Sequence, residues 1–312
     1  MKIAALAGGV GGSKLLLGLY RIMEPSDLTI IVNTGDDVAM HGLHVSPDPD
    51  IITYTLAGVV NEETGWGIAG ETFRLAEGLS RYGRPTWFKL GDRDLATHIH
   101  RTALLKDGAT LSQAMDSIRT ALGVRARMLP MSEDPVPTML ETSEGPMHLQ
   151  DYLVRRRCEP KLKAIAFEGS EQARAAPGVI EAIAEADGIV ISPSNPLISI
   201  GPILAVPGVR EALRRKRAYV AAVCPLVGGK SLKGPSDKMM AELGHEVSAA
   251  GVASLYRDIC GAFIIDEADE AAGTAIRALD MRPVVRPTVM KSVEDRERLA
   301  RHVLALFGPN RA

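Results

Sequence analysis

The sequence has little of several residue types, and each shortage excludes a class of protein. Only 3 of the 312 residues are cysteine (Cys158, Cys224 and Cys260), and no two of them form a Cys-x-x-Cys pair. A zinc ribbon or a thioredoxin-like redox site therefore has no support, and reduced thiols in a cytosolic protein are expected. Aromatic residues make up 4% of the chain. That is few for a platform that stacks the bases of single-stranded nucleic acid.

An excess of positive charge is also missing. The chain has 36 Lys and Arg against 38 Asp and Glu, a formal net charge of −2, so nothing favours binding to nucleic acid or to an anionic membrane surface. No apolar run approaches the roughly 20 residues that span a bilayer. The apolar start at 3–7 is shorter than the roughly 7–15 residues of a signal-peptide core, so we interpret it as a buried strand and expect a cytoplasmic protein.

Strands and helices are expected to alternate along the chain. Short apolar runs, most of them followed by turn residues and a helical pattern, lie at 2–7, 28–32, 86–90, 163–167, 188–192, 219–224 and 262–265. This alternation predicts an α/β fold, a Rossmann-like doubly wound parallel sheet with helices on both faces. A closing amphipathic helix is expected over 293–307.

One region interrupts this alternation. Two short runs at 127–129 and 138–141 are followed by a short helical stretch at 149–156. We therefore expect a small inserted hairpin-helix module over 125–160, within a Rossmann-like domain formed by 1–124 and 161–312. Because ligands of open parallel sheets bind beyond the carboxyl ends of the strands, the loops that follow strands are the candidate site.

The first strand leads into a glycine-rich turn that ends in Lys14. Glycines let the backbone approach a phosphate, and the following helix start supplies N–H groups. The turn matches neither the P-loop, which needs Gly-Lys-Ser/Thr, nor the dinucleotide fingerprint, which needs a third glycine where Lys14 stands. A purely structural turn is the alternative to a phosphate site at Gly9, Gly11, Gly12 and Lys14.

Two later loops carry similar hydrogen-bond donors. Ser194 and Asn195 follow the most apolar strand and precede a short helix, which is typical of an anion site. Gly229, Lys230 and Lys233 follow another strand and suit the phosphates or the base of a nucleotide. A flexible, solvated lysine loop is the alternative for this last segment.

The loop after the second strand is rich in carboxylates, because Asp36, Asp37, Asp48 and Asp50 all lie within 36–50. Such crowding is unfavourable unless the charge is neutralised, and Mg²⁺ bridging to substrate phosphates would neutralise it. We expect these four carboxylates to hold Mg²⁺. N-capping of the following helix is the alternative for Asp48 or Asp50.

Arg93 stands between Asp92 and Asp94 after the strand expected at 86–90. It either makes a local ion pair with them or turns its planar guanidinium toward the oxygens of a ligand. His98 and His100 in the next helix are two residues apart and do not share a face, so structural roles are favoured for both.

Several motifs occur together in one order. They are Leu6-Ala-Gly-Gly-Val-Gly-Gly12, Asn33-Thr-Gly-Asp-Asp37, His41-Gly-Leu43 with Ser46-Pro-Asp48, Tyr54-Thr-Leu-Ala-Gly58, Gly65-Trp-Gly67, Leu90-Gly-Asp-Arg-Asp-Leu-Ala-Thr-His98, Ser192-Pro-Ser-Asn-Pro196, and Gly228-Gly-Lys230 with Lys233-Gly-Pro235. Together they resemble the 2-phospho-L-lactate transferase (CofD-like) family of coenzyme F-420 biosynthesis. The resemblance runs from residue 1 to about residue 265, and nothing is inferred from it for the inserted module or for the tail beyond about residue 268.

This resemblance implies a Mg²⁺-dependent transferase that is usually a homodimer. The implied donor is a guanosine diphosphate ester of a three-carbon acid, derived from phospholactate, phosphoenolpyruvate or phosphoglycerate. The implied acceptor is the deazaflavin Fo, whose terminal ribityl hydroxyl attacks the phosphorus next to the acid while GMP leaves. Such an in-line displacement needs positioning and charge neutralisation more than covalent catalysis, which agrees with the loops described above.

Roles for individual residues follow from this comparison. We expect Asp48 and Asp50 to be catalytic, and Fo to lie near Asp48, Asp50 and Arg93. The nucleotide is expected at Gly9, Gly11, Gly12, Lys14, Ser194, Asn195, Gly229, Lys230 and Lys233. A nucleotide-sugar-binding regulator of cell-wall metabolism, from a branch with a related glycine-rich loop, is the main alternative, but a pure binder has less need of a carboxylate cluster. An NAD(P) dehydrogenase would place an acid where Asn33 stands.

Overall fold

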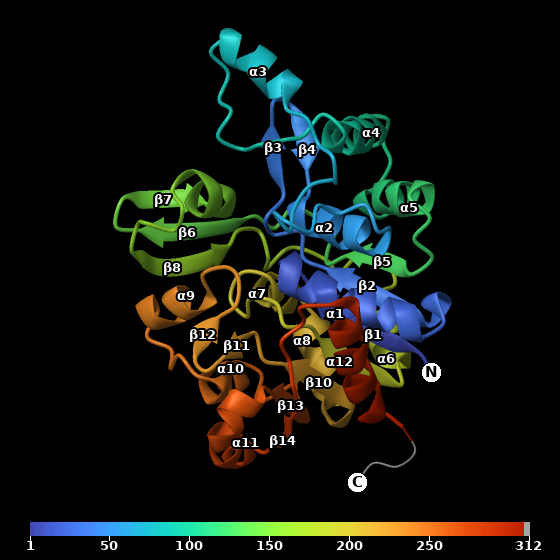
Figure 1. The fold of residues 1–312 in the computed structure, drawn as a ribbon, viewed down its shortest axis with the longest axis vertical. Coiled ribbons are helices and arrows are strands. Elements are labelled where there is room, and N and C mark those ends of the chain that lie inside the picture. Colours follow the sequence, from blue (N-terminus) through green and yellow to red (C-terminus); the bar gives the residue numbers. More distant parts are fainter. Residues whose placement is uncertain (309–312) are drawn as a thin grey trace.

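The computed structural model describes residues 1–308 as an α/β protein built on one large parallel sheet (Figure 1). The strands of this sheet lie in the order β14-β13-β10-β9-β1-β2-β5, and every neighbouring pair is parallel. They are β1 (Ile3–Ala7), β2 (Leu28–Val32), β5 (Arg127–Pro130), β9 (Gly188–Ile191), β10 (Val220–Val223), β13 (Ala262–Ile265) and β14 (Arg282–Val285).

Helices cover both faces of the sheet, which confirms the expected doubly wound, Rossmann-like architecture. Along β1, Ala4 and Leu6 pack toward one face, and Ile3, Ala5 and Ala7 pack toward the other. Burial on both faces explains why the strands are continuous apolar runs. One face is covered by α1 (Gly9–Ile22), α2 (Pro47–Leu56), α5 (Leu111–Ala121) and α12 (Val293–Ala305). The other is covered by α6 (Val179–Glu185), α7 (Ile200–Ala205), α8 (Val209–Arg215), α10 (Ala249–Leu255) and α11 (Gly273–Ala278).

The strand order reverses between β1 and β9. From β1 the chain continues outward to β2 and β5, and from β9 it continues in the opposite direction to β10, β13 and β14. The chain therefore turns away in opposite directions after β1 and β9, and the crevice outside the carboxyl ends of the strands at such a switch point is where ligands bind. The glycine turn after β1 and the Ser194 loop after β9 border this crevice.

Two strands belong to different sheets from those expected. β5, expected in the inserted module, pairs with β2 at the edge of the main sheet. β8 (Leu162–Phe167), expected in the main sheet, pairs with β6 (Thr138–Thr142) in a small antiparallel sheet. Both expectations were wrong because short apolar runs look alike, and the neighbour of a strand is set by tertiary packing. The division of the chain into domains stays a prediction.

The small sheet has the order β7-β6-β8, with β7 covering Gly145–His148. The helix expected at 149–156 is a single π-helical turn, Asp151–Arg155. Nearby, α9 (Ser236–Glu242) follows a short hairpin of β11 (Leu226–Val227) and β12 (Lys230–Ser231). In Figure 1 this sheet and α9 lie to one side of the main sheet.

A long excursion leaves the carboxyl end of β2. It contains the hairpin of β3 (Val38–Met40) and β4 (Leu43–Val45), then α2, then α3 (Arg74–Arg81) at the top of Figure 1, and it leads into α4 (Asp94–Lys106). Residues 86–90 form no strand, so that prediction was wrong. Their apolar side chains instead pack against the β3–β4 hairpin. No helix of the chain up to residue 308 is long and apolar enough to cross a membrane.

Candidate functional site

A cavity of about 590 Å³ lies at the crevice between β1 and β9 and is called here the polar cavity. Asp36 and Asp48 line it, together with parts of all three predicted nucleotide loops. Its lining contains six of the nine residues predicted for the nucleotide, namely Gly9, Gly11, Lys14, Ser194, Asn195 and Lys233. Within residues 1–308, the lining does not include Gly12, Gly229 or Lys230.

The glycine turn is needed because the loops from β1 and β9 lie very close together. A side chain at Gly11 would overlap the carbonyl oxygen of Pro193, and one at Gly8 would overlap the carboxylate of Asp48. Ser194 joins the two loops, since its Oγ accepts from Gly8 N at 3.2 Å and donates to Gly8 O at 2.7 Å. The turn therefore brings a flexible backbone and a helix start to the same point.

Asn195 has a more local role than predicted. Its Oδ1 accepts hydrogen bonds from the backbone N–H groups of Leu197 and Ile198, at 2.9 and 3.3 Å. The side chain thereby shapes the turn after β9, and its oxygen is not free for a ligand.

Positive charge gathers at one wall of the polar cavity. Burial is the main cause that lowers the pKa of Lys14, and the charges of Arg296 and Lys233 lower it further. Cations crowded in this way are stabilised by an anion, so the wall suits the phosphates of a nucleotide.

Residues 61–67, called here the bridging segment, cover this wall. Lys233 Nζ donates to Thr64 O at 2.9 Å, and Arg296 NH1 lies 3.3 Å from Glu62 Oε1. The next residue but one, Trp66, lines a different cavity described below. One short segment thus contacts the lysine and arginine side chains on one side and a second cavity on the other.

Asp48 sits at the floor of the polar cavity. Its Oδ1 accepts from Gly9 N at 2.6 Å, and its Oδ2 accepts from Asn33 Nδ2 at 2.8 Å. Burial raises the pKa of Asp48 to about 6, although both hydrogen bonds act in the opposite direction. Asp48 therefore does not act simply as a helix cap, because it connects α2 to the glycine turn and to Asn33.

Asp36 lines the same cavity as Asp48. Its Oδ2 accepts from Gln150 Nε2 at 3.2 Å, whereas its Oδ1 is buried and has no partner in the described structure. Burial first, and then the charges of Asp48 and Asp37, raise the pKa of Asp36 well above its usual value. A hard cation would satisfy the free oxygen and relieve this repulsion, so Asp36 and Asp48 fit a Mg²⁺ ion.

The other two carboxylates predicted for the metal have polar or charged partners, although Asp37 Oδ1, like Asp36 Oδ1, is buried and has no hydrogen-bond partner in the described structure. Ser46 Oγ donates to Asp37 Oδ2 at 2.8 Å, and His44 Nε2 lies 2.8 Å from the same oxygen. Both oxygens of Asp50 contact the guanidinium of Arg101, with NH1 donating to Oδ2 at 3.2 Å. Arg101 therefore neutralises Asp50, whereas Asp37 keeps one oxygen without a hydrogen-bond partner among the described residues.

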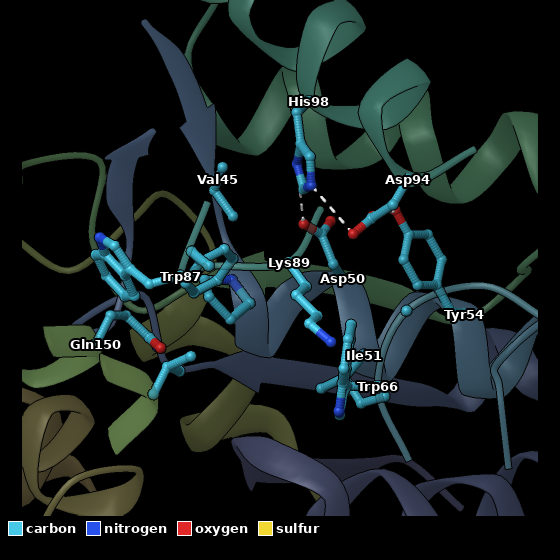
Figure 2. A pocket seen from close by; sticks show the side chains of 14 residues that line it. Val45, Asp50, Ile51, Tyr54, Trp66, Trp87, Lys89, Asp94, His98 and Gln150 are labelled. Atoms are coloured by element: carbon cyan, nitrogen blue, oxygen red, sulfur yellow. Dashed lines mark hydrogen bonds and ion pairs between the residues drawn. The ribbon is translucent and has the colours of Figure 1, made fainter. Parts of the chain in front are cut away.

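Asp50 instead lines a second cavity, of about 420 Å³, called here the aromatic cavity (Figure 2). Rings and aliphatic chains from α2, the bridging segment and residues 86–90 surround it, and Trp87 and Phe88 meet edge to face with ring centroids 5.8 Å apart. The labelled lining in Figure 2 is Val45, Asp50, Ile51, Tyr54, Trp66, Trp87, Lys89, Asp94, His98 and Gln150. Such a lining suits a flat heteroaromatic ring.

Three ligand atoms of Asp50, Asp94 and His98 lie within 4.8 Å of one another, a spacing that a metal site would have. Arg101, however, already supplies the positive charge at Asp50. A dication beside a buried guanidinium would be repelled, so this group is better described as a polar network than as a metal centre.

Arg93 does not line either cavity. It is exposed, and its NH1 donates to Ala69 O at 2.8 Å while its backbone N–H donates to Glu71 at 2.7 Å. Its neighbour Asp92 accepts from the backbone N–H of Arg74 at 3.1 Å and caps α3. Among residues 1–308, Arg93 makes no ion pair with Asp92 or Asp94.

Comparisons with known proteins identify the family of the chain. The sequence model of the family described as 2-phospho-L-lactate transferase CofD matches residues 3–295. The chain belongs to the CofD family. The resemblance inferred from the motifs is thereby confirmed, and the chain is a member of a transferase family.

Relatives in the CofD family carry two names. A phosphoenolpyruvate transferase of Kitasatospora aureofaciens is 44% identical, with 98% of each chain covered. A 2-phospho-L-lactate transferase of Methanosarcina mazei is 40% identical, with 96% of this chain and 99% of the relative covered. A solved structure of a UPF0052 family protein from Bacillus halodurans has a TM-score of 0.68 at 17% identity over 97% of this chain and 98% of that one, which supports the fold alone.

Several residues that line the two cavities were not predicted from the sequence as ligand-binding residues. Trp66 and His98 occur in the quoted motifs without an assigned ligand role, and the segment 288–291, which lines the polar cavity, lies in the tail for which nothing was inferred. The spacing of Asp94, His98 and Arg101 was a usable signal, because i, i+4 and i+7 share one helix face.

Proposed function

We propose that the protein transfers a phospho-three-carbon-acid group, of the 2-phospho-L-lactate type, from a guanosine diphosphate ester to the terminal ribityl hydroxyl of the deazaflavin Fo. GMP is the leaving product, and the step belongs to coenzyme F-420 biosynthesis. We also propose the homodimer that the family resemblance implies, which light scattering of the purified protein tests.

One observation carries this proposal: a polar cavity and an aromatic cavity share the first turn of α2. Asp48 lines the polar cavity, and Asp50, two residues later, lines the aromatic cavity. Gln150 lines the aromatic cavity and donates to Asp36, which lines the polar cavity. A donor and an acceptor bound in these cavities meet at the turn that carries both aspartates.

The residues of the polar cavity suit the donor. The glycine turn and the N-terminus of α1 receive the diphosphate, and Lys14 and Lys233 neutralise the charge that builds on the departing GMP. Asp36 and Asp48 would hold Mg²⁺, which would supply further charge neutralisation at the phosphates.

The residues of the aromatic cavity suit the acceptor. The deazaflavin ring lies among Trp66, Trp87 and Phe88, and its ribityl chain extends toward α2. Asp50 accepts the proton of the attacking hydroxyl as the new O–P bond forms. A nucleotide-sugar-binding regulator has no need of this second cavity, so the aromatic lining favours the transferase.

The test is an incubation of the purified protein with Fo, Mg²⁺ and guanosine diphosphate esters of either lactate or enolpyruvate. Mass spectrometry should detect a deazaflavin that has gained the phospho-acid, together with stoichiometric GMP. Because the relatives carry both names, each donor is assayed separately, and the ratio of their kcat/KM values identifies the acid. Guanosine ester binding without any deazaflavin product, from these two donors or from the corresponding glycerate ester, would exclude the transferase and favour a binding protein.

A further inference from the structure

A buried stripe of polar side chains joins α4 to α2 beside the aromatic cavity. Asp94, His98 and Arg101 share one face of α4, and Asp50 and Tyr54, four residues apart, share one face of α2. None of the five residues is more than 8% exposed. The two stripes therefore face each other inside the protein.

The contacts within the stripe converge on Asp50. His98 lies between two carboxylates, with Nδ1 3.6 Å from Asp50 Oδ2 and Nε2 3.2 Å from Asp94 Oδ2 (Figure 2). The hydroxyl of Tyr54 donates to Asp94 Oδ1 at 2.6 Å and so fixes the carboxylate of Asp94 beside His98. Arg101 contacts both oxygens of Asp50, and its NH1 also lies 3.3 Å from His98 Nδ1.

Stability alone is a poor explanation for this arrangement. Taking two carboxylates and a guanidinium out of water costs about as much as their attraction returns, and packed apolar side chains would serve the fold equally well. What the network does provide is a single orientation for the carboxylate of Asp50 at the cavity wall.

The orientation leaves Asp50 able to accept a proton. Each carboxylate oxygen has two acceptor positions, and Arg101 occupies one on each oxygen. His98 Nδ1 accepts from Arg101 NH1 at 3.3 Å and lies 3.6 Å from Asp50 Oδ2, so the imidazole limits rotation of the carboxylate without taking its second acceptor position.

We infer that His98 and Arg101 are positioning residues, which hold the carboxylate of Asp50 with one acceptor position turned toward the acceptor hydroxyl in the aromatic cavity. This inference rests on the proposed function. In that step the hydroxyl oxygen bonds to phosphorus, the bond from phosphorus to the GMP oxygen breaks, and the proton passes to Asp50 and later to water.

A double-mutant cycle tests this inference. Asp50→Asn is expected to lower kcat by about a hundredfold, a size typical of a lost general base. His98→Asn is expected to lower kcat by about tenfold, since a misplacement of about 1 Å costs up to about a hundredfold. In the Asp50→Asn background the same His98 substitution should change kcat less than twofold, because a positioning residue has nothing left to position.

Arg101→Lys gives a second readout if His98→Asn does not fold. The variant keeps the positive charge but loses the two-pronged contact, so kcat should fall while the KM for the guanosine ester and the affinity for GMP stay within twofold. His100→Ala is the matched control, because His100 lies on the same helix, is exposed and contacts Ser117. It should match the parent in every measurement.

These measurements distinguish a failure of the proposed function from a failure of the positioning role of His98 and Arg101. If the parent is inactive with the lactate, enolpyruvate and glycerate donors, the proposed function fails and this inference fails with it. If the parent is active and the losses of Asp50→Asn and His98→Asn multiply in the double variant, the proposed function stands and the inference is wrong. A parallel rise in the KM for the guanosine ester would also overturn it, because that would indicate a general loss of structure.

Discussion

Replacing Asp48 by asparagine is expected to stabilise the protein at neutral pH in the absence of metal, although it removes a site residue. Burial raises the pKa of this carboxyl from 3.8 to about 6, so the folded state holds the proton more tightly than the unfolded chain does. Stability is therefore fully present below about pH 4, falls as the pH rises from about 4 to about 6, and stays reduced above pH 6.

The size of the effect follows from two opposing contributions. A rise in pKa from 3.8 to about 6 corresponds to about 3 kcal/mol lost by the parent at pH 8. In the variant, the new amide oxygen still accepts from Gly9 N, but the new amide nitrogen faces Asn33 Nδ2, another donor. That mismatch costs about 1–1.5 kcal/mol. The variant should thus be more stable by about 1–2 kcal/mol at pH 8, and less stable by about 0.5–1 kcal/mol at pH 4, where the mismatch outweighs the small loss that the parent still has.

Urea unfolding followed by circular dichroism, with chelator present, measures both differences. The reversal of sign between pH 4 and pH 8 is the decisive result. An equal difference at the two pH values would refute the reasoning, because it would show that the Asp48 carboxyl does not titrate differently in the folded state. Adding Mg²⁺ at pH 8 should then raise the midpoint of the parent and leave that of the variant nearly unchanged, since a ligand stabilises only the state that binds it.

Three further substitutions separate the cavities. Lys233→Met should weaken GDP binding, measured by calorimetry, by about tenfold or more, because a charge-assisted hydrogen bond contributes about 1.5–3 kcal/mol. Lys230→Met is the control and should bind GDP like the parent, because Lys230 lies outside the polar cavity. Equal losses of GDP affinity in both variants would contradict this prediction. Trp87→Ala should raise the KM for Fo about tenfold with the donor KM unchanged, because a stacking ring contributes about 1–3 kcal/mol; an unaltered KM for Fo would remove the acceptor from the aromatic cavity. Arg93→Ala should lower the melting temperature with normal kinetics, because its guanidinium donates to the backbone at Ala69 O; a raised KM for Fo at an unchanged melting temperature would return Arg93 to the site.

The architecture was largely predictable from periodicity. Continuous apolar strands such as Gly188–Ile191, alternating with helices, indicate a parallel sheet covered on both faces. Strand neighbours were not predictable in the same way, as β5 and β8 demonstrate. Residues 86–90 were misread because apolar side chains that pack in a loop have the same composition as a buried strand.

The site was predictable where a local pattern implies chemistry. Glycines before Lys14 indicate a phosphate loop, and six of the nine residues predicted for the nucleotide do line one cavity. The role of each aspartate was not predictable, since the contact of Asp50 with Arg101 joins residues 51 positions apart. The aromatic cavity depends on Trp66 and Trp87, which come together only through the excursion between β2 and α4.

The bridging segment has a consequence for how the two substrates bind. It contacts Lys233 and Arg296 through Thr64 and Glu62, and it places Trp66 in the aromatic cavity. A phosphate that draws Lys233 away from Thr64 changes the free energy of holding this segment in place, and with it the affinity for a ring beside Trp66. Thermodynamic linkage makes this influence mutual, so the acceptor must alter donor affinity by the same factor. The affinity of either substrate measured alone is then expected to differ from its affinity in the ternary complex.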